Sequence, residues 1–519
     1  MKQSYDIAIA GSGFAGSLMA MIALRLGYSV VLLEQGQHPR VVIGESSTPL
    51  ANLLLEQLCH RYDLPAVSPL AKWGTWQQTY PEIACGLKRG FTFYHHAAAE
   101  ETDPSTSFNR QLLVAASPHN DISDTHWYRA DFDMFLVDQA RAIGVDYCDN
   151  THVERVECKN AGVRMTGTRH GDNFSLHAQF LMDATGPRGL LHRALQLKNV
   201  PLPGYPETQA LWSHFEGVSR PPGTSLGQPP YPPEDAAVHH LFEGGWIWVL
   251  RFNNGITSAG IAATDAAAEK FGFAEGAAAW TRLLASMPSL QAQFATARPT
   301  RPFRHLPRLS FLSEAVVGQR WALLPSAAGF VDPLLSTGFP LTLLGVERMA
   351  RILESGLASP TLAAELEKYE KQTKDELLAA ARLISALYAN IGNFPVFRAL
   401  CLLYFAAASY AETARRLNKP ELAQAFLLHQ HATFGPEMRG ILDRATRVPQ
   451  ASDAARLIED IHRCIEPIDV AGLGRPNPSH WYPVDANDLL DSCGKVGAIR
   501  QEIEDLLQRC GFFETQKAR

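Results

Sequence analysis

The sequence has few long uncharged runs, and neither of its two candidate apolar segments is predicted to be a membrane helix or a secretion signal. The longest uncharged run, residues 7–24, contains three glycines and two serines, and a second apolar run, residues 399–411, is too short to span a bilayer. We therefore expect a protein without a membrane span and place it in the cytoplasm.

The sequence also has no large excess of one charge sign and no Cys or His spacing typical of a metal site. The chain has 47 Lys and Arg against 53 Asp and Glu and no block of like charge, which disfavours nucleic acid or an anionic membrane as a partner. Its 8 cysteines form no CxxC pair, its 18 histidines form no HExxH motif, and there is no GxSxG elbow. These absences predict reduced thiols, no metal and no serine nucleophile.

What is present at the amino terminus is the pattern of a βαβ unit. An apolar strand at residues 5–10 runs into a GxGxxG turn, a helix follows, and a second strand at residues 29–33 ends in an acidic residue. Glycines permit the tight turn and the approach of a pyrophosphate, the helix end offers N–H groups to phosphate, and the acid can accept from ribose hydroxyls. The predicted dinucleotide site comprises Gly11, Ser12, Gly13, Ala15, Gly16 and Glu34.

The segment that follows the second strand helps to choose the dinucleotide. Residues 42–49 place several hydrogen-bond donors around one carboxylate, whereas an NAD dehydrogenase would usually continue with another helix–strand repeat. The segment thus favours FAD, and an ordinary loop is the alternative.

These two segments resemble the signatures of the flavin-dependent halogenases, which are relatives of the FAD-containing aromatic monooxygenases. Residues 181–186 are similar to the strand that returns the chain to the FAD domain, and residues 327–338 resemble the late FAD- and halide-binding stretch. Residues 84–93 resemble the catalytic-lysine segment of the phenolic, phloroglucinol-type branch. Residues 245–250 resemble most of the WxWxIP signature, but Leu250-Arg251 stands where Ile-Pro is usual.

The resemblance implies a reaction and its components. Reduced FAD, O2 and chloride or bromide would give hypohalous acid, which would halogenate an aromatic small molecule, free or tethered to a carrier protein, in antibiotic or other secondary metabolite biosynthesis. A separate flavin reductase would supply the reduced FAD. An FAD monooxygenase, an FAD-dependent reductase or dehydrogenase of a hydrophobic substrate, and a non-catalytic flavoprotein are the alternatives.

Lys88 is the catalytic residue that the resemblance implies. An ammonium can donate a hydrogen bond to hypohalous acid, and a neutral amine can form a haloamine. Either role needs a partly desolvated lysine, because burial lowers the pKa of an amine. The alternative is a solvated lysine at the edge of a strand.

The same resemblance implies roles for residues that hold halide and cofactor. The backbone N–H groups of Thr337 and Gly338 would bind halide, and an ordinary helix N-cap is the alternative. For Arg129, the alternative to an FAD contact is an ion pair with Asp133 at i+4. The implied FAD contacts beyond the glycine turn are Gly44, Glu45, Ser46, Arg129 and Asp332.

Four further residues concern the substrate. Trp246 and Trp248 alternate along a strand and would line the passage that keeps substrate from the flavin, and Phe93 would line the same wall. Leu335 stands where tryptophan halogenases carry a glutamate that orients indole. Because phenols are already electron-rich, the leucine favours a phenolic ring.

The predicted fold class is α/β, with a Rossmann-like FAD-binding domain, a β-sheet substrate-side region and an α-helical C-terminal region. The FAD-binding domain is discontinuous and covers residues 1–354, with β-rich insertions at about 71–123 and 200–311. Apolar residues recur at helical spacing from about residue 361, so residues 355–519 are predicted to form the helical region.

Overall fold

The first sheet is built around the amino-terminal βαβ unit, which consists of β1 (Ser4–Ala10), α1 (Phe14–Arg25) and β2 (Val30–Leu33). In the computed structural model, which describes residues 2–96, 103–447 and 451–513, its strand order is β18-β19-β10-β1-β2-β7. The pairs β1–β2, β1–β10, β10–β19 and β2–β7 are parallel. Its other strands are β7 (Asp146–Cys148), β8 (Thr151–Lys159), β9 (Gly162–Arg169), β10 (Asp172–Asp183), β18 (Val317–Gly318) and β19 (Trp321–Leu323).

The glycines of the turn between β1 and α1 are required by the close packing there. Gly11 has φ +95°, and a Cβ on Gly16 would lie 1.9 Å from the carbonyl oxygen of Gly11. This close approach lets α1 start directly above the end of the strand. The helices α4 (Arg129–Ala142) and α10 (Gly338–Ser355) pack against α1.

A second, largely antiparallel sheet forms the other half of the molecule. Its order is β15-β11-β14-β13-β12-β4-β5-β21, with β16 paired to β11. Its strands are β4 (Gly90–His95), β5 (Gln111–Ala115), β11 (Thr208–Glu216), β12 (Ala237–Phe242), β13 (Gly245–Arg251), β14 (Thr257–Thr264), β15 (Arg298–Pro299), β16 (Arg304–Leu306) and β21 (Trp481–Tyr482).

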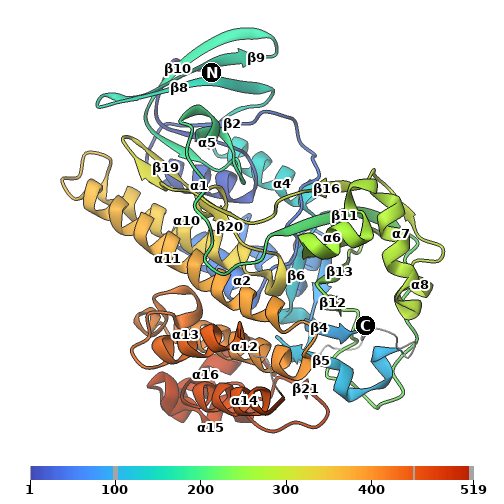
Figure 1. The fold of residues 1–519 in the computed structure, drawn as a ribbon. Coiled ribbons are helices and arrows are strands. Elements are labelled where there is room, and N and C mark those ends of the chain that lie inside the picture. The colour runs from blue at the N-terminus through green and yellow to red at the C-terminus, as the bar shows by residue number, and fades with distance from the viewer. Residues whose placement is uncertain (1, 97–102, 448–450, 514–519) are drawn as a thin grey trace.

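One face of this sheet carries helices that the sequence analysis did not single out. They are α6 (Asp265–Phe271), α7 (Ala277–Ala285) and α8 (Pro288–Gln293), seen in green at the right of Figure 1. Trp280 and Leu283 of α7 pack with Phe215 of β11 in a separate apolar cluster.

Short elements link the two sheets where the predicted site residues lie. The strands β3 (Cys85–Lys88) and β6 (Asp124–Trp127) form a two-stranded antiparallel sheet, and β17 (Phe311–Leu312) pairs with β20 (Gly329–Phe330). The helices of this part are α2 (Pro49–Arg61), α3 (Trp73–Thr79), α5 (Leu190–Ala194) and α9 (Pro325–Ala328).

The carboxy-terminal part is helical, as predicted, and most of it lies below the first sheet in Figure 1, in orange and red. Its helices are α11 (Leu362–Ala389), α12 (Phe394–Arg416), α13 (Phe434–Ala445), α14 (Ala451–Ile465), α15 (Ala486–Asp491) and α16 (Arg500–Arg509). Among the described residues, α12 alone has the length and apolar composition to cross a membrane, and 78% of its most apolar window is buried within the fold. The predicted α/β fold class with a helical carboxy-terminal region is confirmed.

Candidate active site

The N-terminus of α1 is open to an anion. No side chain caps it, and its first turn contains no acidic residue, so its N–H groups and partial positive charge are available. At the end of β2, Glu34 accepts hydrogen bonds from the N–H and the hydroxyl of Ser12 at 3.1 and 2.7 Å. Burial opposes ionisation of Glu34, but Arg40 and the bonds from Gly36 and Ser12 outweigh it and hold the pKa below its usual value. An ionised acceptor thus stands beside the helix end, as a ribose requires.

Arg129 forms the ion pair that was the alternative to a cofactor contact, and it also lies beside the glycine turn. Its guanidinium donates two bonds of 2.8 Å to the buried Asp133 and one of 2.9 Å to the carbonyl of Gly44. Its Nη2 is 3.5 Å from the position that a Cβ on Gly13 would take. The ion pair therefore orients the guanidinium towards the phosphate end of the site.

Two cofactor-side residues were missed by the sequence analysis. Arg40 Nη2 lies 3.6 Å from the position of a Cβ on Gly13, and His38 Nε2 lies 2.8 Å from Ser12 Oγ. Their other ring and guanidinium nitrogens, Nδ1 of His38 and Nε of Arg40, are buried without a partner in the described chain. A signal existed, since both basic residues lie in the short segment that follows β2 and begins with Glu34. A pyrophosphate at the helix end would accept hydrogen bonds from these donors and from the N–H groups of α1, so the residues present fit FAD.

Glu45 is paired across the molecule with a residue that no local pattern marks. Its Oε1 lies 2.8 Å from Nε2 of His214 on β11, and both side chains are almost fully buried. The remaining Oε2 of Glu45 and Nδ1 of His214 have no partner among the described residues. The pair ties the segment after β2 to the second sheet.

Lys88 is completely buried at the end of β3. Its Nζ donates to Ser46 Oγ at 2.9 Å and to the carbonyl of Ser47, and it lies 3.9 Å from the centroid of the Phe91 ring. The strand is held tightly, because a Cβ on Gly86 would lie 2.1 Å from the carbonyl oxygen of Arg251. Lys88 is therefore not a solvated strand residue.

The charge of Lys88 is coupled to Asp124. The two residues are direct partners in the register of β3 and β6, and both are buried. Burial lowers the pKa of Lys88 to about 7, against the opposing charge of Asp124. Burial likewise raises the pKa of Asp124, against the opposing charge of Lys88. Burial thus favours the neutral amine, whereas the charge of Asp124 favours the ammonium.

Aromatic rings cover the face of the second sheet next to Lys88. Trp246 and Trp248 lie on one side of β13 as predicted, with ring centroids 5.8 Å apart. His239 stacks on Phe93 at 4.6 Å and lies 5.0 Å from Trp246. Phe91 continues the row, 6.2 Å from Phe93. A continuous aromatic wall therefore runs from the lysine to the Trp strand.

The predicted halide turn precedes α10. Leu335 and Ser336 have φ of 62° and 55°, values that cost non-glycine residues of order 1 kcal/mol or more. Thr337 is the N-cap of α10, no side chain caps this helix, and its first turn carries no acid. The backbone around Thr337 and Gly338 can therefore accept an anion.

This turn is packed against both other parts of the site. The ring centroid of Phe339, in the first turn of α10, lies 5.0 Å from the ring centroid of Phe14 in α1. The two open helix ends are therefore neighbours. On the other side, Trp246 Nε1 donates to the hydroxyl of Tyr388 at 3.2 Å, and Tyr388 donates to Asp332 Oδ2 at 3.0 Å. Burial raises the pKa of Asp332 to about 6. These two hydrogen bonds connect the segment before α10 to β13.

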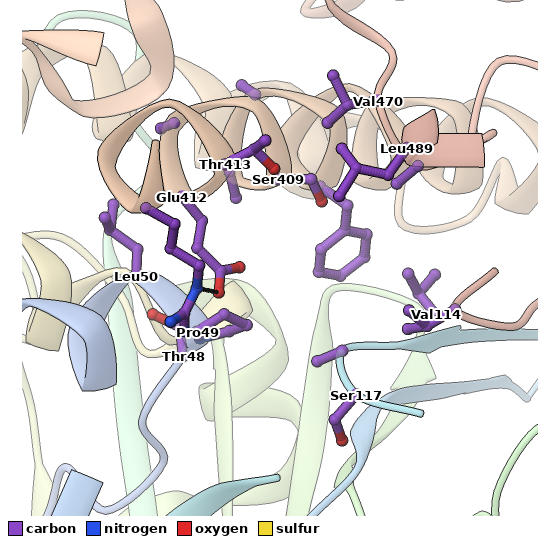
Figure 2. Close-up of a pocket in the computed structure, with 18 of the residues that line it drawn as sticks. Thr48, Pro49, Leu50, Val114, Ser117, Ser409, Glu412, Thr413, Val470 and Leu489 are labelled. Atoms are coloured by element: carbon purple, nitrogen blue, oxygen red, sulfur yellow. Dashed lines mark hydrogen bonds and ion pairs between the residues drawn. The ribbon is translucent and has the colours of Figure 1, made fainter. Parts of the chain in front are cut away.

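A cavity of about 210 Å³ lies between the second sheet, α12 and the last helices (Figure 2). Phe91, whose ring is in contact with Lys88, lines it. Tyr404 also lines it and donates to the carbonyl of Leu335 at 3.1 Å. The labelled lining residues of Figure 2 are Thr48, Pro49, Leu50, Val114, Ser117, Ser409, Glu412, Thr413, Val470 and Leu489.

Comparisons with known proteins identify the family of the chain. Residues 115–391 match the family model described as tryptophan halogenase. Relatives include monodechloroaminopyrrolnitrin halogenase PrnC of Pseudomonas fluorescens, 29% identical over 77% of this chain and 70% of that protein. Tetracycline 7-halogenase of Kitasatospora aureofaciens is 28% identical over 80% of this chain and 75% of that protein.

A solved structure shows the same fold. Halogenase PltM, in complex with phloroglucinol and FAD, matches with a TM-score of 0.78 and 23% identity, covering 91% of this chain and 98% of PltM.

Proposed function

The chain belongs to the tryptophan halogenase family and is an FAD-dependent halogenase, and from this premise we propose that it chlorinates or brominates a phenolic ring with Lys88 as catalytic residue. When bound, reduced FAD with O2, halide and a proton supplies hypohalous acid, with oxidised FAD and water as the other products. The tasks of the protein are to hold halide and cofactor, exclude water and present the oxidised halogen to the ring.

Cofactor and halide would bind at the two neighbouring helix ends, those of α1 and α10. The open N-terminus of α1, Glu34 and Arg129 would hold FAD, and the backbone at Thr337 and Gly338 would hold the halide. The aromatic wall that includes Trp246 would separate the substrate from the flavin side.

Lys88 acts in this proposal as an ammonium. Two of its three N–H donors point to Ser46 Oγ and Ser47 O. The third would bond the oxygen of hypohalous acid once the Phe91 ring, 3.9 Å from Nζ, turns aside. The aromatic ring attacks the halogen, the oxygen departs towards Lys88, and the ring proton completes a water molecule. The net step converts arene and hypohalous acid to haloarene and water. A haloamine on the neutral Lys88 is the other route.

The observation that carries the proposal is the position of the cavity. One of its wall residues, Phe91, contacts the buried amine, and another, Tyr404, is bonded to the halide turn. A substrate in this cavity would lie beside Phe91 and Tyr404, and rotation of the Phe91 ring would bring it into contact with Lys88.

The size and lining of the cavity support a substituted or fused ring. An engineered cavity of about 150 Å³ holds benzene, and this one measures about 210 Å³. Ser117, Ser409 and Thr413 can bond phenolic hydroxyls. The lining also includes charged residues of α12, among them Glu412 and Arg416. Leu335 supplies no acid, which suits a ring that is already activated.

The test supplies the enzyme with FAD, a separate flavin reductase, NADH, O2 and chloride or bromide. Free and carrier-bound phenols, pyrroles and indoles serve as substrates, and mass spectrometry detects halogen isotope doublets. A halogenated phenol is the expected product. Hydroxylation in the absence of halide would favour a monooxygenase, and halogenation of indole alone would overturn the phenolic substrate.

Lys88→Met removes the amine while keeping the side chain's volume. We expect halogenation to fall by about a hundredfold or more, while oxidation of reduced FAD continues and hypohalous acid escapes to a solution trap. The control is Lys371→Ala, because Lys371 is exposed and paired with Asp375 on α11. Persistent halogenation by Lys88→Met would remove the catalytic assignment.

Three further assignments belong to the same proposal. A separate reductase supplies the reduced flavin, so rapid NADH oxidation by the isolated chain would contradict it. The protein acts in the cytoplasm. The FAD-binding domain covers residues 1–354, with insertions at about 71–123 and 200–311, and residues 355–519 form the helical region that covers the cavity.

A further inference from the structure

Asp124 is a buried acid for which the halogenation step described above has no use. It stands at the first position of β6, directly opposite Lys88 in the antiparallel register with β3. Directly opposed residues have Cβ atoms about 4.5–5.5 Å apart, so the carboxyl and the amine lie on the same face of this small sheet.

The partners of Asp124 leave one of its oxygens free. Its Oδ1 accepts a hydrogen bond of 2.9 Å from Nδ2 of Asn52 on α2. Its Oδ2 is buried and has no partner in the described part of the chain. A buried carboxylate with one unsatisfied oxygen is costly unless a positive charge is near, and Lys88 is the cation opposite it.

From this juxtaposition we infer that Asp124 is a positioning residue that keeps Lys88 in its ammonium form during halogenation. The inference rests on the proposed role of Lys88. A carboxylate opposite the amine stabilises the charged form that can donate to hypohalous acid, and Asn52 stabilises that carboxylate in turn.

The other groups around the pair do not replace this function. Burial lowers the pKa of His126 and of His239 to about 3, so both rings are neutral near pH 7. From α12, Glu412 and Arg416 influence Asp124 with opposite signs, and they bond to each other at 2.8 Å. Asp124 is thus the one acid among these groups that favours the charged form of Lys88.

The test is the pH profile of halogenation by the full-length enzyme with FAD and a flavin reductase. In the wild type the rate should fall as pH rises through the pKa of Lys88. Asp124→Asn removes the charge that stabilises the ammonium, so the alkaline decline of the rate should move to lower pH by about one unit. On the alkaline side this shift lowers the halogenation rate by about tenfold. The rate should fall less at acidic pH, and KM and FAD affinity should change little.

Asn52→Ala provides a second variant that leaves Asp124 in place. Loss of the hydrogen bond makes the carboxylate harder to form, so the alkaline decline should move in the same direction by a smaller amount. Asp443→Asn is the matched control, because Asp443 is half exposed and pairs with Arg382 on the surface. Urea unfolding and FAD fluorescence quenching establish that each variant is folded.

The outcomes separate this inference from the proposed function. If Lys88→Met is inactive but Asp124→Asn and Asn52→Ala keep the alkaline decline of the wild type, only the role of Asp124 is refuted. If Lys88→Met still halogenates, both are refuted. A uniform loss of rate at every pH would show that Asp124 is merely structural.

Discussion

The Nζ of Lys88 lies 3.9 Å from the centroid of the Phe91 ring, and the same ring lines the cavity. Phe91 therefore separates the amine from the space proposed for substrate. The contact also favours the charged lysine, since a buried cation over an aromatic face gains about 2 kcal/mol.

Phe91→Ala should open the cavity to Lys88 at the expense of stability. Deleting a buried phenylalanine ring costs about 3–5 kcal/mol in free energy of unfolding. We expect a broader range of ring sizes among the halogenated products and more hypohalous acid in a solution trap. Phe303→Ala is a control, because Phe303 packs in the separate cluster under α7. An unchanged product distribution in Phe91→Ala would contradict the barrier role.

His214→Leu should destabilise the protein through Glu45. The substitution leaves the buried Glu45 without its partner, and breaking a buried pair in this way costs about 3–5 kcal/mol. The double variant Glu45→Gln/His214→Leu should recover part of the loss, because the remaining side chain carries no charge. Urea unfolding of the wild type, Glu45→Gln, His214→Leu and the double variant measures the coupling. A loss below about 1 kcal/mol in His214→Leu would mean that the pair contributes little.

The parts of the fold that could be predicted from the sequence are those that neighbouring residues determine. The strand, turn and helix at residues 4–25 follow from apolar periodicity and from glycines at fixed offsets. Helical spacing likewise indicated the carboxy-terminal helices. The two-residue strand β21 gave no such signal, because its pairing with β5 depends on a partner almost 370 residues away.

The candidate site divides in the same way. Lys88 could be singled out by a family resemblance, but its burial arises from β6, the segment at Ser46 and Ser47, and the ring of Phe91. Asp124 and His214 could not be found from local pattern, since each meets its partner only through tertiary pairing. The basic residues at 38 and 40 had a local signal that was overlooked.

Gly16→Ala should abolish FAD binding. An added Cβ would lie 1.9 Å from the carbonyl oxygen of Gly11, so the start of α1 must move away from the turn that would hold the pyrophosphate. Gly440→Ala is the matched control, since nothing lies within 4 Å of its added Cβ on α13, and alanine should raise helix stability by up to about 1 kcal/mol. Titration with FAD measures both variants. Wild-type affinity in Gly16→Ala would mean that the cofactor does not use this turn.

Asp332 should make stability depend on pH in the mildly acidic range. Burial raises its pKa from 3.8 to about 6, so between these values the folded protein retains a proton that the unfolded chain has lost. The free energy of unfolding of the wild type should therefore fall as pH rises from 4 to 6, by up to about 1.4 kcal/mol per pH unit from this group. Asp332→Asn cannot titrate, so the stability of the variant relative to the wild type should increase over the same interval and level off above it. Urea unfolding of both proteins at several pH values gives this difference directly, and a constant difference from pH 4 to 7 would show that Asp332 is ionised throughout.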